Sequence, residues 1–115
     1  MAAEGRLAGK VAIVTGAAPR GDGIGNGTAA ALLFAREGAR VVLVNRSAER
    51  GQALADKIAA EGGEAAVFAG DVSETGTADA MAAFATERFG GVDILHNNVG
   101  IGSPGTAETA SLEQW

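Results

Sequence analysis

Residues 11–37 join a short apolar run, a glycine-rich stretch and an alanine-rich run, and this order constrains the fold most strongly. The apolar run Val11–Thr15 predicts a strand, and Thr28–Glu37 predicts a helix that is apolar nearly all round and buried on more than one side. Five glycines fall between residues 16 and 27, too many for a turn without a ligand. Glycine lets the backbone approach an anion closely, and a helix N-terminus offers N–H groups, so this stretch predicts a phosphate-binding loop.

The rest of the chain continues the alternation of strands and helices. Further strands are predicted at 41–45, 65–69 and 92–96, and further helices at 48–60 and after residue 73. Ser47 and Ser73 are the predicted N-caps, and glycine pairs follow each helix. The third helix is expected to turn Met81, Phe84, Ala85 and Phe89 to the core. This order predicts an α/β fold with a doubly wound parallel sheet, truncated after the fourth strand.

Composition excludes several classes of site. The chain has 115 residues, enough for one domain, and a net charge of −5, which argues against a nucleic-acid partner. It has no cysteine and one histidine, so no metal site is predicted. His96 is expected to lie in the sheet without a catalytic role. The absence of a long apolar run argues against a membrane partner, and we expect a cytoplasmic protein.

Polar residues follow the second and third predicted strands. Asn45 and Arg46 come twenty residues after Gly25, where an acidic residue would bind a ribose 2′-hydroxyl and repel a 2′-phosphate. Neutral Asn45 and cationic Arg46 instead favour NADP, although an Asn amide also bonds hydroxyls, so NAD stays open. Arg46 is alternatively a solvated residue at a helix start. Asp71 follows the third predicted strand, and its carboxylate can accept a hydrogen bond from a ligand or cap the turn before Ser73.

The glycine stretch resembles the T-G-x-x-x-G-x-G pattern of the short-chain dehydrogenase/reductase family. The chain departs from this pattern because six residues, and not three, separate Gly16 from Gly23. Residues 97–100, Asn-Asn-Val-Gly, resemble the family's N-N-A-G after the fourth strand, and residues 112–115 resemble the start of its fourth helix. The resemblance covers residues 7–115 and implies a Rossmann-like fold, with 1–115 as the dinucleotide-binding N-terminal part of one domain.

The resemblance also implies a role for each motif in binding NADP or NAD. It places the pyrophosphate at the glycine loop, the nicotinamide near Ile24, the adenosine ribose at 45–46, the adenine at 71–72 and the second ribose at 98–100. The implied cofactor-binding residues are Gly16, Gly23, Ile24, Gly25, Asn45, Arg46, Asp71, Val72, Asn98 and Gly100.

No catalytic residue is predicted in these 115 residues. Family members use a Tyr as acid–base, a Lys beside it and a Ser near the substrate oxygen, and this chain contains no Tyr. The resemblance therefore implies that the intact protein is an NAD(P)-dependent oxidoreductase that acts on a small carbonyl or alcohol and pairs as a homo-oligomer. The chain itself would supply the cofactor site. The alternative is a non-catalytic nucleotide-binding or interaction module.

Overall fold

The computed structural model describes residues 5–17, 26–71 and 74–96. Its four strands are β1 (Val11–Thr15), β2 (Arg40–Asn45), β3 (Glu64–Ala69) and β4 (Ile94–His96). They form one parallel sheet in the order β3-β2-β1-β4. The strands β2 and β3 lie on one side of β1 and β4 lies on its other side, as expected of a doubly wound sheet.

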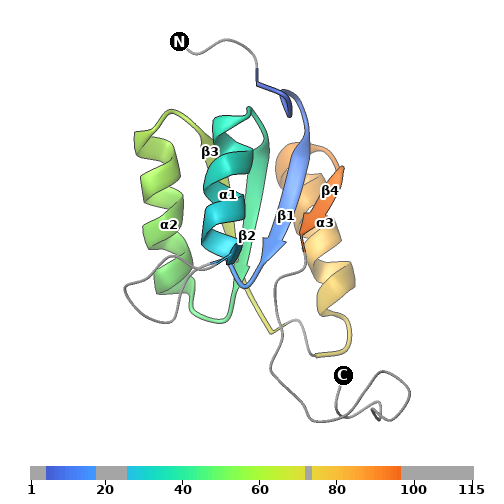
Figure 1. Ribbon diagram of the computed structural model, residues 1–115. Coiled ribbons are helices and arrows are strands. Elements are labelled where there is room, and N and C mark those ends of the chain that lie inside the picture. The colour runs from blue at the N-terminus through green and yellow to red at the C-terminus, as the bar shows by residue number, and fades with distance from the viewer. Residues whose placement is uncertain (1–4, 18–25, 72–73, 97–115) are drawn as a thin grey trace, which may run out of the picture.

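Three helices connect the strands, and they are α1 (Asn26–Arg36), α2 (Ala48–Ala60) and α3 (Thr77–Phe89). Figure 1 shows α1 and α2 together on one face of the sheet and α3 on the other face. Each crossover joins parallel strands, so all four strands end at the same edge of the sheet. This edge is where a doubly wound fold binds its ligand.

Alternate strand residues divide the core into two layers. Val14, Val41 and Leu43 pack with α1 and α2, whereas Ile13 and Val42 pack with α3. The central strands β1 and β2 are almost entirely buried, which explains their continuous apolar sequences. On α3, Met81 and Ala85 are buried and Phe84 and Phe89 pack against the same layer, as the sequence predicts.

Helix α1 buries Thr28, Ala31 and Leu32, whereas Leu33 is 56% exposed. One sequence prediction about the helices is wrong. Helix α3 begins at Thr77, so residue 73 is not its N-cap. The N-cap is Gly76, which adopts a left-handed conformation with φ 89° and provides no side-chain cap. The chain turns first, with the Glu74 amide donating to the Asp71 carbonyl at 3.1 Å.

The last strand is shorter than its apolar sequence suggests. It begins at Ile94, while Val92 lies before it and is 41% exposed. Asp93 instead binds the start of β1, since its Oδ2 accepts from the Val11 amide at 2.9 Å. Within the described ranges β4 lies at the sheet edge, and Leu95 is 59% exposed there.

Candidate dinucleotide site at the carboxyl edge of the sheet

The turn after β1 begins the candidate site. Gly16 follows the strand with φ 60°, a conformation that glycine adopts without a steric penalty. The buried Thr28 hydroxyl, in the first turns of α1, donates to the Ala17 carbonyl at 2.5 Å. This bond ties α1 to the end of β1, so it fixes the two ends of the glycine-rich segment close together. Sequence reasoning assigned no role to Thr28; a hydroxyl residue near a helix start was the available signal.

Asn45 ends β2 beside the end of β3, where it pairs with Ala69. Its Nδ2 donates to the Ser47 carbonyl at 3.1 Å, which holds the amide in place. Ser47 is the N-cap of α2, as the sequence predicts, and its Oγ accepts from the Arg50 amide at 3.2 Å. An amide whose nitrogen is engaged in this way presents its oxygen as an acceptor for a hydroxyl.

Arg46 and Asp71 form an ion pair across the ends of β2 and β3. The Nη2 atom of Arg46 lies 2.5 Å from Oδ2 of Asp71. The Arg46 side chain is 71% exposed and that of Asp71 is 24% exposed. This hydrogen bond, together with the negative charges of Asp71 and Glu74, raises the pKa of Arg46. Arg46 therefore contacts a carboxylate while most of its side chain stays exposed at the helix start.

The structure brings together the predicted site residues that it describes. Asn45 ends β2, and Gly16, Arg46 and Asp71 follow β1, β2 and β3, so all four lie at the same edge of the sheet. The other predicted residues lie outside the described ranges, and these are Gly23, Ile24, Gly25, Val72, Asn98 and Gly100.

The donors and acceptors at this edge suit a dinucleotide. A backbone turn at a positive-φ glycine, an amide oxygen, a guanidinium and a carboxylate lie beyond three neighbouring strands. Groups of these types can bind a phosphate, a ribose hydroxyl and an adenine amine.

The family assignment rests on residues 10–115, which match the model of the short chain dehydrogenase family. This chain belongs to the short-chain dehydrogenase family. The parallel sheet, its strand order and the turn after β1 agree with the Rossmann-like fold that the sequence predicts.

Similar proteins include several dehydrogenases. The chain is 41% identical over 110 residues to 2,5-dichloro-2,5-cyclohexadiene-1,4-diol dehydrogenase of Sphingobium indicum, covering 96% of the chain and 42% of that protein. It is 40% identical to D-threitol dehydrogenase of Mycolicibacterium smegmatis, covering 96% of the chain and 40% of that protein. The structure of L-sorbose reductase from Gluconobacter frateurii, complexed with NADPH and L-sorbose, matches with a TM-score of 0.77 and 38% identity, covering 97% and 41% of the two chains. The chain thus spans about two fifths of the length of these relatives.

His96 lies in the sheet, as the sequence predicts, and it pairs with Val14 of β1. Its carbonyl accepts from the Thr15 hydroxyl at 3.4 Å, and its ring meets that of Phe34 edge-on at 5.9 Å. No group of three or more metal-ligating side chains occurs within residues 5–17, 26–71 and 74–96. Among the helices described, none has the length and apolar character that a membrane span requires.

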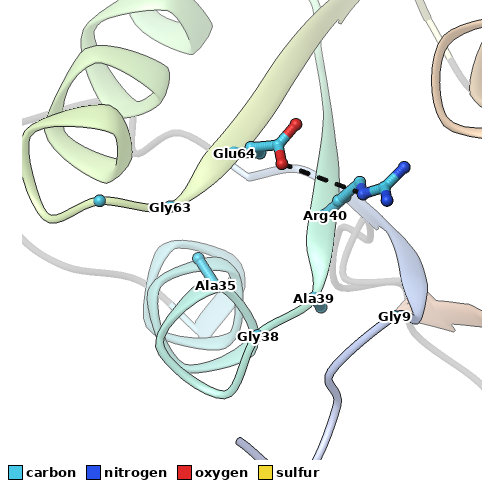
Figure 2. A pocket seen from close by; sticks show the side chains of 8 residues that line it. Gly9, Ala35, Gly38, Ala39, Arg40, Gly63 and Glu64 are labelled. Carbon is cyan, nitrogen blue, oxygen red and sulfur yellow. Dashed lines mark ion pairs between the residues drawn. The ribbon is translucent and has the colours of Figure 1, made fainter. Parts of the chain in front are cut away.

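A cavity of about 270 Å³ lies at the opposite edge of the sheet, away from the candidate site. Figure 2 shows Arg40 and Glu64 beside it, at the first positions of β2 and β3. Their charged groups are 4.0 Å apart and both side chains are largely exposed. Much of its lining is glycine and alanine, which offers little chemistry for recognising a ligand.

Proposed function

We propose that the chain is the dinucleotide-binding N-terminal part of a single Rossmann-like domain in an NAD(P)-dependent oxidoreductase. The arrangement of Gly16, Asn45, Arg46 and Asp71 beyond three adjacent parallel strands carries this proposal, together with the family assignment. The intact protein would transfer a hydride between the nicotinamide and a small carbonyl or alcohol. We further propose that it acts in the cytoplasm as a homo-oligomer, without a nucleic-acid or membrane partner.

Within the site, each segment would hold a different part of the cofactor. Gly16, Gly23 and Gly25 would surround the pyrophosphate, and Ile24 would lie near the nicotinamide. Asn45 and Arg46 would bind the adenosine ribose, Asp71 and Val72 the adenine, and Asn98 and Gly100 the other ribose. The described contacts support the assignment of Asn45 and Arg46 to the adenosine ribose, because the Asn45 oxygen suits a hydroxyl and the Arg46 guanidinium suits a 2′-phosphate.

These residues bind and orient the cofactor but supply no proton to the reaction. The bound nicotinamide would provide the hydride, and a proton donor is needed for the alkoxide that forms. The 115 residues contain no Tyr, so the Ser, Tyr and Lys of the family are proposed to lie outside them. The names of relatives, a threitol dehydrogenase and a sorbose reductase, support a substrate that carries hydroxyl or carbonyl groups.

Titration of the complete polypeptide with NADPH and NADH, followed by cofactor fluorescence, tests the proposal. We expect both cofactors to bind and NADPH to bind more tightly. Replacing Gly23→Val should abolish binding, because a branched side chain would fill the space for the phosphate. Gly91→Val is the matched control, since a Cβ at Gly91 meets no atom within 4 Å.

Three results would count against the proposal. Unchanged affinity in Gly23→Val would place the cofactor elsewhere, and tenfold tighter binding of NADH would overturn the preference for NADP. A complete polypeptide that binds NADPH but reduces no carbonyl from a panel of sugars and ketones would favour a non-catalytic nucleotide-binding module.

A further inference from the structure

The Arg46–Asp71 pair joins two residues that each have a separate proposed role toward the cofactor. Arg46 is proposed to bind the 2′-phosphate and Asp71 the adenine, yet the two side chains bind each other at 2.5 Å. The pair lies between the segment that leads into α2 and the segment that follows β3. A 2′-phosphate that approaches Arg46 therefore meets a cation already bound by a carboxylate.

The negative charges around Arg46 oppose the binding of a 2′-phosphate to it. Asp71 carries one negative charge against the single positive charge of Arg46, and Glu74 adds a further negative field at the guanidinium. The net charge of these three side chains is −1, whereas a 2′-phosphate carries close to two negative charges at neutral pH. Binding the phosphate thus requires Arg46 to share its donors and to bring like charges together.

The exposure of the pair sets the size of this effect. Because the Arg46 side chain is 71% exposed, solvent screens the pair, and loosening it costs a factor of about five or less in an equilibrium. The pair therefore weakens NADP binding without preventing it. The guanidinium has five N–H donors and the contact with Asp71 uses Nη2, so one cation can bind both partners.

We propose that Asp71 is a specificity-determining residue, which through its ion pair with Arg46 lowers the preference for NADP over NAD. This inference rests on the proposed function. NAD has a hydroxyl where NADP has the phosphate, and it does not need the Arg46 donors. The Asn45 oxygen can accept from that hydroxyl, so NAD binding is little affected by the pair.

The test is a set of NADPH and NADH titrations on Asp71→Asn in the complete polypeptide. Asn removes the charge but keeps an oxygen that can accept from adenine, so any loss at adenine affects both cofactors alike. The ratio of the two dissociation constants isolates the effect on specificity. We expect Asp71→Asn to raise the preference for NADPH by about twofold to fivefold, and a rise of less than twofold, or a fall, would overturn the inference.

Three controls separate the direct pair from other charge effects. Glu74→Gln removes a nearby charge without removing the hydrogen bond, and it should shift the ratio less than Asp71→Asn does. Glu61→Gln breaks a different ion pair, Arg36–Glu61, and should leave the ratio unchanged. In an Arg46→Gln background, Asp71→Asn should change the ratio by less than twofold; the full gain in that background would contradict the mechanism.

The outcomes also distinguish this inference from the proposed function. If the unmodified protein binds neither NADPH nor NADH, the proposed function fails. If it binds both and the ratio does not respond to Asp71→Asn, only the role of Asp71 fails. If the Asn variant does not fold, Asp71→Ser removes the same carboxylate with a smaller side chain. We expect it to raise the preference for NADPH in the same way.

Discussion

The bond between Thr28 and Ala17 predicts how strongly the glycine-rich segment depends on one hydroxyl. Thr28 is 6% exposed and Ala17 is fully buried, and the donor and acceptor lie 2.5 Å apart. Thr28→Val keeps the shape of the side chain and removes the hydroxyl donor, so the buried Ala17 carbonyl loses this hydrogen bond. Removing one partner of a buried hydrogen bond costs about 1–3 kcal/mol of unfolding free energy.

Urea unfolding of the complete polypeptide, followed by circular dichroism, measures this cost. With a denaturant slope of about 2 kcal/mol/M, the loss corresponds to a fall of about 1 M in the midpoint. Thr28→Ser is the matched control because it keeps the hydroxyl and loses one methyl group, at about 1 kcal/mol. We also expect Thr28→Val to weaken NADPH and NADH by the same factor, since Thr28 fixes the segment and not the adenosine end.

Two results would refute this reasoning. A Thr28→Val protein with the same unfolding midpoint as the original would show that the hydroxyl contributes nothing to stability. A larger loss in Thr28→Ser than in Thr28→Val would show that packing of the methyl group, and not the hydrogen bond, is what matters.

Two further predictions concern stability. Gly51→Ala should destabilise the protein by about 1 kcal/mol in urea unfolding, because an added Cβ would lie 2.9 Å from the stiff Val67 side chain. This overpacking outweighs the gain of about 1 kcal/mol in helix propensity. Gly91→Ala is the control, since its added Cβ meets no atom within 4 Å, and a more stable Gly51→Ala protein would contradict the packing argument. The hydrogen bond from Arg36 lowers the pKa of Glu61 below its ordinary value of 4.5, so this pair stabilises the fold above that value and the contribution is lost as the pH falls through the lower folded pKa. The difference in unfolding free energy between the original protein and Glu61→Gln should thus be present at pH 7 and shrink as the pH is lowered below 4.5, and a difference that grows on acidification would show the opposite sign.

The sequence predicts the central strands well because their physics is local. Val41 to Val44 form an unbroken apolar run, and such a run fits a strand covered on both faces. The start of α3 was not predictable in the same way. Ser73 is a favourable capping residue, but Gly76 adopts a positive φ that no pattern of side chains reveals.

The contact between Arg46 and Asp71 was beyond prediction for a different reason. Both residues were identified as cofactor ligands, one strand end at a time, and they are twenty-five positions apart in the sequence. Only the pairing of β2 with β3 brings the two ends side by side. The sequence thus indicated which residues gather at the edge but not which of them bind one another.

The close approach of α2 to β3 at Gly51 has a consequence for how cofactor preference can be altered. Arg46 lies in the segment that joins β2 to α2, and Asp71 follows β3, so a shift of α2 relative to β3 would move the segment that carries Arg46. A substitution on the buried face that pushes α2 outward would loosen the pair without touching either partner. Selection or engineering for a different nicotinamide cofactor can therefore act through the interior of the protein as well as through the binding surface.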